Sequence, residues 1–123
     1  MYKIIVSGSR DFSDYNLLKT TLDSFIENHP DNHIVIISGT ARGADKMGEK
    51  YARERGYHLL SYPADWKRYG KMAGFIRNGI MAKNGDALVA FWDGESKGTK
   101  NMISLAGKHN LDTKVIKYKE LTN

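Results

Sequence analysis

The chain has no cysteine among its 123 residues, and this absence excludes disulfides, thiolate metal sites and cysteine nucleophiles. It also lacks any apolar run of membrane-spanning length. Its start, Met1–Val6, is too short and too soon interrupted by Ser7-Gly8 to be a signal peptide. We therefore expect a cytoplasmic protein that does not enter a membrane.

Metal-ligand clusters and catalytic triads are missing as well. The histidines His29, His33, His58 and His109 are scattered, and Pro30 interrupts the helix that would align the first two. No serine has an evident base partner in the sequence. The sequence thus predicts no metal, no cofactor and no Ser-His-Asp arrangement.

The composition fits one soluble globular domain over residues 1–123, with 41% hydrophobic residues and no low-complexity tract or linker. The formal charge is +5. Residues 1–62 carry eight Lys/Arg against eight Asp/Glu, whereas residues 63–123 carry eleven against six. A positive second half would attract an anionic partner such as a nucleotide or nucleic acid, although solubility alone also explains it.

Short β-branched runs alternate with helical patterns along the chain. This alternation predicts an α/β fold: a Rossmann-like or flavodoxin-like domain with a five-stranded, mostly parallel sheet and helices on both faces. The third helix should place Met72, Phe75, Ile76, Ile80 and Met81 in the core. The expected strands are Tyr2–Val6, His33–Ile37, Tyr57–Tyr62, Asp86–Phe91 and Lys114–Tyr118; the expected helices run from Ser13 or Asp14 to about His29, and over Ala44–Arg55, Met72–Lys83 and Lys97–His109.

Polar loops follow the first four strands, and in a parallel sheet all four loops lie at the same edge. Glycine allows backbone N–H groups to approach a ligand, and helix N-termini favour negative charge. Hydroxyl and guanidinium groups in these loops can add phosphate donors. No loop matches a standard nucleotide motif, and each alone could be a surface turn. The loops are Ser7–Asp11, Ser38–Asp45, Pro63–Trp66 and Trp92–Thr99.

Three kinds of residue have two interpretations. Arg77 and Asn78 lie among apolar residues in the third expected helix, where they either face solvent or contact a ligand. Trp66 and Trp92 follow strand ends, where they either stack on a base or fill the core and its rim. Asp93 follows the fourth strand, where it either holds ribose hydroxyls or caps the next helix.

Four segments in order resemble the YspA-like branch of the SLOG superfamily: SGSRDF, SGTARGAD, ADWKRYGKMAGFIRNGIM and AFWDGESKGT. The resemblance covers nearly the whole chain. It implies a Rossmann-like sheet that binds nucleotides or nucleotide-derived ligands, and dimers are common in the superfamily. Members include cytokinin-activating phosphoribohydrolases, the DNA-processing protein Smf/DprA and sensors of cyclic ADP-ribose-type signals.

The phosphoribohydrolase signature resembles P-G-G-x-G-T-x-x-E with an upstream R-K-x-x-M. Gly98-Thr99 matches its G-T pair, and Arg77 and Met81 keep the upstream spacing, which implies that Arg77 contacts the ligand. Gly94 stands at the proline position and Met102 at the glutamate position. Since methionine can neither transfer a proton nor stabilise an oxocarbenium ion, an enzyme of this kind would need another acid. Asp93 is the first candidate, with Asp45, Asp65 and Glu95 nearby.

We therefore expect a protein that binds a nucleotide-derived small molecule of the ADP-ribose, cyclic ADP-ribose or nucleotide type, as a sensor or a sequestering protein. Two alternatives stay open: an N-glycosidase or phosphoribohydrolase using Asp93, and a nucleic-acid binder whose phosphate track is Lys67, Arg68, Lys71, Lys97 and Lys100. A homo-oligomer is a further expectation from the resemblance. The expected ligand-binding residues are Gly8, Ser9, Arg10, Ser38, Gly39, Thr40, Arg42, Asp45, Asp65, Trp66, Arg77, Asn78, Trp92, Asp93, Gly94, Ser96, Lys97, Gly98 and Thr99.

Overall fold

Five strands and five α-helices alternate along the chain in the computed structural model, which describes residues 1–29 and 33–119. The elements are β1 (Tyr2–Gly8), α1 (Tyr15–Glu27), β2 (Ile34–Ser38), α2 (Ala44–Arg55), β3 (His58–Ser61), α3 (Trp66–Tyr69), the 3-10 turn η1 (Gly70–Met72), α4 (Ala73–Asn84), β4 (Ala87–Trp92), α5 (Lys97–Lys108) and β5 (Asp112–Lys117).

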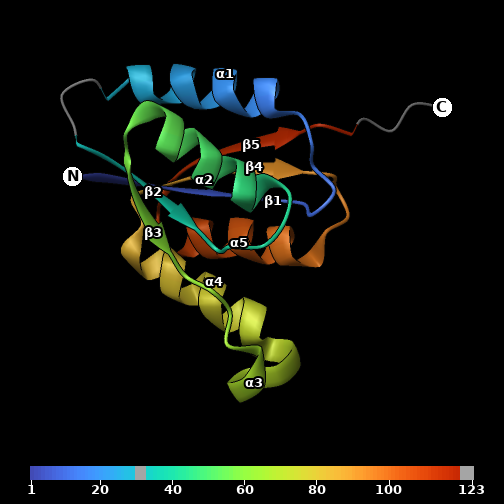
Figure 1. Ribbon diagram of the computed structural model, residues 1–123. Coiled ribbons are helices and arrows are strands. Elements are labelled where there is room, and N and C mark those ends of the chain that lie inside the picture. The colour runs from blue at the N-terminus through green and yellow to red at the C-terminus, as the bar shows by residue number, and fades with distance from the viewer. Residues whose placement is uncertain (30–32, 120–123) are drawn as a thin grey trace.

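The strands form one sheet in the order β3-β2-β1-β4-β5, and every neighbouring pair is parallel. Helices α1 and α2 lie on one face, and α4 and α5 lie on the other (Figure 1). The predicted α/β, Rossmann-like class is confirmed. The direction of winding changes between β1 and β4, and in sheets of this type the crevice outside the carboxyl ends at that point is the usual ligand site.

The central strand β1 contributes to both layers of the core. Ile4 and Val6 face the α1–α2 layer, where they pack with Leu22, whereas Ile5 faces the opposite layer with Met81. All of these side chains are fully or almost fully buried. Burial on both faces explains why the central strands read as unbroken apolar runs.

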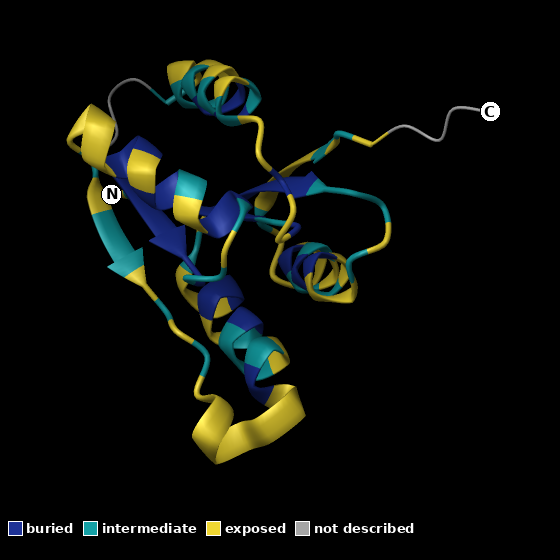
Figure 2. Cartoon of the chain, turned by 45° about the vertical axis from the view of Figure 1, so that its right-hand side comes forward, coloured by how far each residue is buried: buried dark blue, intermediate teal, exposed yellow. Residues whose placement is uncertain are grey.

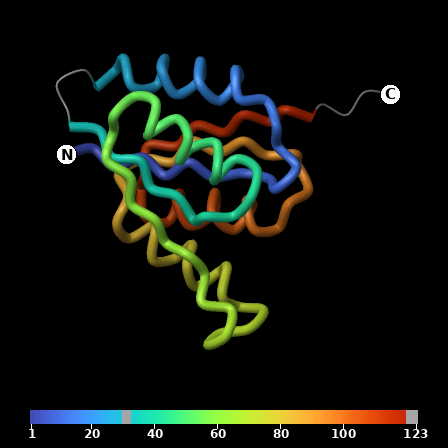
Figure 3. Tube along the Cα trace, viewed as in Figure 1, coloured from blue at the N-terminus to red at the C-terminus, as the bar shows by residue number. Residues whose placement is uncertain are grey.

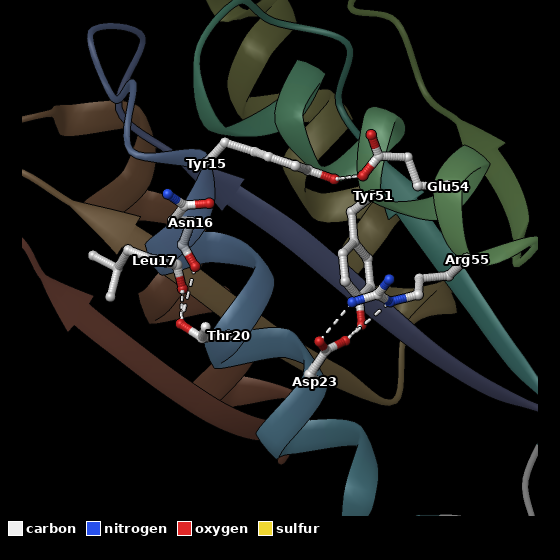
Figure 4. A network of polar contacts seen from close by, with 8 residues as sticks. All are labelled: Tyr15, Asn16, Leu17, Thr20, Asp23, Tyr51, Glu54 and Arg55. Carbon is white, nitrogen blue, oxygen red and sulfur yellow. Dashed lines mark hydrogen bonds and ion pairs between the residues drawn. The ribbon is translucent and has the colours of Figure 1, made fainter.

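A polar network joins α1 to α2 on the outer side of the first layer (Figure 4). The Tyr51 hydroxyl donates to Asp23 Oδ1 at 2.5 Å, and Arg55 Nη2 lies 2.6 Å from Asp23 Oδ2. The Arg55 hydrogen bond is the main reason that the pKa of Asp23 is lowered. The network fixes α2, whose first turn points to the carboxyl edge of the sheet.

Between β3 and α4 the chain forms an arm, α3 and η1, that projects from the body and has no buried residue (Figures 2 and 3). The sequence interpretation had only a loop here. The Asp65 carboxylate caps the short helix by accepting from the Arg68 N–H at 3.2 Å. Gly70 then adopts a φ of +56°, a left-handed conformation that glycine tolerates without strain.

Two further expectations are corrected. The third helix begins at Ala73, and it leaves Met72, Phe75 and Ile80 exposed rather than in the core. Strand β5 begins two residues early because the polar Asp112 and Thr113 lie on an exposed edge strand, where burial imposes no apolar pattern. Among the described residues no helix is long and apolar enough to cross a bilayer.

Candidate functional site

The loops after β1, β2 and β4 and the start of α4 surround a cavity of about 220 Å³ at the carboxyl edge of the sheet. A second cavity of about 470 Å³ adjoins it, since Arg10, Ala41, Trp66 and Arg77 line both. The first cavity is also lined by Ser7, Gly8, Asp45, Lys71, Gly74, Phe75, Asn78, Ser96, Gly98 and Thr99, and the second by Gly39, Thr40, Arg42, Pro63 and Ala64.

The first turns of two long helices face this cleft. Helix α5 contributes Gly98 and Thr99 to the lining, and Ser96 caps the helix through its Oγ, which accepts from the Thr99 N–H at 3.3 Å. Helix α2 contributes Asp45. Because first-turn N–H groups have no intrahelical acceptor and the helix dipole is positive there, both ends favour an anion.

Arg77 reaches the cleft from α4. Its Nη1 donates to the Gly39 carbonyl and to the Tyr62 carbonyl at 3.4 Å, and its Nε donates to Asn78 Oδ1 at 3.0 Å. A Cβ on Gly39 would lie 2.7 Å from Arg77 Nη1, so a larger residue there would displace the guanidinium from its present position. Burial is the main cause of the lowered pKa of Arg77. The side chain is therefore held rigidly against both cavities rather than extended into solvent.

Asn78 and Ser38 lie beneath the cleft and organise its walls. Asn78 Nδ2 donates to the Gly98 carbonyl at 3.2 Å and to Asn101 Oδ1 at 3.0 Å, which ties α4 to the first turn of α5. Ser38 is fully buried, and its Oγ donates to Glu49 Oε2 at 2.7 Å and accepts from the Thr40 N–H at 3.0 Å. Asn78 lines the cavity, whereas Ser38 does not.

Asp45 is the single acidic residue among those that line the two cavities. It is 5% exposed, and its Oδ2 accepts from the Ala41 N–H at 3.2 Å. Burial raises the pKa of Asp45 to about 6, against the smaller opposing effects of the Ala41 N–H and Arg77. The cavity thus contains one carboxyl whose burial raises its pKa towards neutrality.

Asp93 does not line either cavity. Its Oδ1 accepts from the N–H groups of Glu95 and Ser96, both at 2.8 Å, and the Ser96 bond is the main reason that its pKa is lowered. Ser9 is buried and accepts from the Asp93 N–H at 3.1 Å, so it joins the first loop to the fourth from outside the lining. Asp93 therefore stabilises the loop that precedes α5, whereas Ser96 is the residue that caps this helix.

The two tryptophans differ in position. Trp92 donates from Nε1 to the Ser96 carbonyl at 3.1 Å, and Lys117 Nζ lies 5.6 Å from its ring centroid. It lies outside the cavity lining, and so do Gly94 and Lys97. Trp66 lines both cavities and is 52% exposed, which leaves its ring available to a planar group. Asp65, next to it, caps α3 outside the two cavities.

Five residues that line the first cavity were absent from the expected set, and the second cavity adds Pro63 and Ala64. Ser7 directly precedes the Gly8-Ser9 pair, so its position was the available signal. The alanine between Thr40 and Arg42 offered none. The remaining three come from the arm and α4, where Phe75 was assigned to the core on periodicity alone. The missed residues of the first cavity are Ser7, Ala41, Lys71, Gly74 and Phe75.

Met102, at the position of the phosphoribohydrolase glutamate, lies in the core and does not border the cleft. Met102 is fully buried in the α4–α5 layer, where it packs with Ile5 and Met81. Within residues 1–29 and 33–119, no group of three or more His, Asp or Glu side chains is arranged to hold a metal ion. The groups that border the cleft are two helix ends, arginines, an aromatic ring and one carboxyl.

Comparisons with known proteins agree with this architecture. The model of the YspA, cpYpsA-related SLOG family matches residues 2–69. The Gene 61 protein of Mycobacterium phage D29 is 32% identical over 114 residues, which cover 88% of this chain and 90% of the phage protein.

Two solved structures share the fold at low identity. DNA processing protein A (DprA) from Streptococcus pneumoniae superposes with a TM-score of 0.69 at 21% identity, over 94% of this chain and 50% of DprA. The structural genomics target TM1055 superposes with a TM-score of 0.66 at 17% identity, over 92% of this chain and 72% of the TM1055 chain. The chain thus spans half of DprA, and both likenesses concern the fold alone.

Proposed function

Since the chain belongs to the YspA, cpYpsA-related SLOG family, we propose that it binds a nucleotide-derived small molecule in the cleft, as a sensor or a sequestering protein. The ligand would be of the ADP-ribose, cyclic ADP-ribose or nucleotide type. Phosphates would lie against the first turns of α5 and α2, with Arg10, Arg42 and Arg77 as donors. Trp66 would stack on the base.

One observation carries this proposal: two helix N-termini and the rigid Arg77 converge on a cleft whose outer wall is aromatic. Backbone N–H groups and arginine are the donors that phosphate prefers, and an indole ring is a stacking surface for a base. A nucleotide carries both groups that such a cleft could bind: a phosphate for the donors and a base for the exposed Trp66 ring.

A thermal-shift screen tests the proposal, with AMP, GMP, NAD, ADP-ribose, its cyclic isomers and single-stranded DNA at moderate salt. A ligand at a hundredfold excess over its dissociation constant adds about 2.7 kcal/mol to the free energy of unfolding, so Tm should rise by several degrees. Chromatography of the same sample shows whether the ligand is intact.

The Arg77→Ala variant should lose at least tenfold in affinity for any ligand found, because it removes the guanidinium that borders both cavities. Arg53→Ala is the matched control, since Arg53 is exposed near the end of α2 that lies away from the cleft. Equal affinity of the two variants would show that the ligand does not bind in this cleft.

A second candidate function is cleavage of an N-glycosidic bond, and the observation that favours it is the position of Asp45. A carboxyl in the cavity with a pKa raised to about 6 suits general acid or base work near neutral pH. Asp93, whose Oδ1 is held by its own loop, is less suited. Free base released by the wild type and not by Asp45→Asn would support this function.

A third candidate is single-stranded nucleic acid binding by the projecting arm, which carries Trp66 and Tyr69 beside Lys67, Arg68 and Lys71. Exposed aromatic and basic residues together form stacking and phosphate sites. Such binding should fall steeply with salt, whereas binding in the cleft should depend less on it. A Tm shift with DNA alone in the screen would favour this role.

A further inference from the structure

The carboxyl of Asp45 is out of place in a site for an anion. The cleft is lined by the basic residues Arg10, Arg42, Lys71 and Arg77, and Asp45 is the single acid among its lining residues. An ionised carboxylate would repel a phosphate and would have no proton to offer it. The inference below depends on the proposed function, because it concerns how an anionic ligand is accepted there.

The Asp45 carboxyl is held in a fixed position at the wall of the cleft. It lies in the first turn of α2, is 5% exposed and is held by the Ala41 N–H at 3.2 Å. A Cβ built on Gly39 would lie 2.8 Å from Asp45 Oδ2 and 2.7 Å from Arg77 Nη1, so both groups flank the same glycine. No ion pair joins these two described side chains.

The charged groups around Asp45 are few. Arg77 from α4 and Arg10 from the loop after β1 favour the ionised form, whereas Glu49, one turn further along α2, opposes it. Glu49 is itself paired with Lys46 at 3.5 Å. Burial outweighs these neighbours and keeps the pKa of Asp45 near 6.

Histidines do not offer a second proton site at the cleft. His29, His33 and His58 line a separate cavity with Arg55 and Tyr57. His109 follows the last turn of α5, whose first turn borders the cleft. Asp45 is thus the lining group suited to exchange a proton when the ligand binds.

We propose that the cleft binds its anionic ligand together with one proton, which Asp45 holds so that its carboxyl donates a hydrogen bond to the ligand. In the protonated form the O–H donates to a phosphate or sugar oxygen, and the negative charge beside Arg77 is gone. No covalent step is involved. Affinity is then coupled to pH through a single side chain.

This coupling has a defined slope. Above the titration midpoint of Asp45, each pH unit should lower the affinity roughly tenfold, because a proton must be taken up with the ligand. Below the midpoint the proton is already present, and affinity should level off. The same proton uptake should appear as a calorimetric heat that depends on the buffer.

ADP-ribose is the probe for the test. Its two phosphates form a pyrophosphate bridge between two riboses, and each has a single, strongly acidic ionisation. Its charge therefore stays constant between about pH 5 and about pH 8, whereas a terminal phosphate such as that of AMP titrates near pH 6. Isothermal titration calorimetry over this range, in two buffers of different ionisation enthalpy, measures both the affinity and the number of protons taken up.

The Asp45→Asn variant is the decisive comparison, because its amide donates a hydrogen bond without a proton from solvent. It should bind ADP-ribose with an affinity that is flat in pH and without proton uptake. Glu95→Gln is the matched control, since Glu95 is exposed on the loop after β4 and does not line the cavities. This control should keep the pH dependence of the wild type.

The outcomes separate the two proposals. Binding of ADP-ribose by the wild type with no proton uptake and no pH dependence would overturn this inference and leave the proposed function intact. Absence of binding at every pH, in the wild type and in Asp45→Asn, would reject both for this ligand. An NMR titration of the Asp45 carboxyl without ligand adds an independent check, because its midpoint should coincide with the pH above which the affinity falls. A clear mismatch between the two would overturn the assignment of the proton to Asp45.

Discussion

At the scale of single residues, the buried carboxyl of Asp45 should also affect stability. Its pKa is about 6 in the folded chain against an ordinary value of 3.8, so the folded state binds the proton more tightly. The folded state therefore loses stability as pH rises from about 4 through about 6. The loss relative to low pH is at most about 3 kcal/mol for a shift of this size.

Asp45→Asn removes this titration while keeping an acceptor for the Ala41 N–H. The variant should gain about 2 kcal/mol over the wild type at about pH 8 and little or nothing at about pH 4. Urea denaturation at both pH values measures the difference. An equal change at the two pH values would mean that packing, rather than ionisation, is responsible.

The residues that the sequence left ambiguous were decided by where their side chains lie. Arg77 and Asn78 were mid-helix polar residues with two interpretations, and the structure places both at the cleft. Asp93 and Trp92 were placed by their position after β4, but their side chains bond to their own loop. Sequence position locates a backbone, whereas rotamers follow from neighbours that are distant in sequence.

At the scale of elements, the first turn of α5 combines a structural role with a proposed binding role. The Ser96 hydroxyl caps the helix, and loss of such a cap costs about 1 kcal/mol. Ser96→Ala should therefore lower the free energy of unfolding by about that amount in the absence of ligand. Urea denaturation measures this loss.

Ser104→Ala is the control on the same helix, where Ser104 is exposed and alanine is the better helix former. It should be neutral or slightly stabilising. If the two variants lose equal stability, the cap hydrogen bond has no effect of its own.

Elements with strong periodicity or complete burial were the predictable ones. The strands β1, β2 and β4 are apolar because helices cover both of their faces, and the sequence places them to within two residues. The arm was missed because a four-residue helix has no periodicity to detect. Phe75 and Met72 were wrongly assigned to the core, because apolar residues at this spacing can form either a buried or an exposed helix face.

At the scale of the whole molecule, the strand order β3-β2-β1-β4-β5 brings four distant segments to one edge. The alternation of elements predicted both the fold class and this edge, and the SLOG resemblance implied the same fold. All four loops named from the sequence contribute lining residues, but the sequence did not indicate that Lys71, Gly74 and Phe75 would join them. That depends on how far α4 and the arm extend past the sheet, which is a matter of tertiary packing (Figure 1).

The projecting arm should unfold locally more readily than the central strands. Amides in the central strands should exchange with deuterium only on global unfolding, whereas those of α3 and η1, which bury no side chain, should exchange far earlier. Trp66 and Lys71 of the arm also line the first cavity. A bound ligand would hold the arm against the cleft. Hydrogen exchange of the arm amides should therefore slow on binding, while exchange in the central strands should hardly change.

Hydrogen exchange with and without ADP-ribose measures this contrast. Equal protection of the arm in both states would show that the arm takes no part in binding. If the contrast is found, part of the binding free energy is spent on ordering the arm. Stiffening the arm in advance should then tighten binding without any new contact to the ligand.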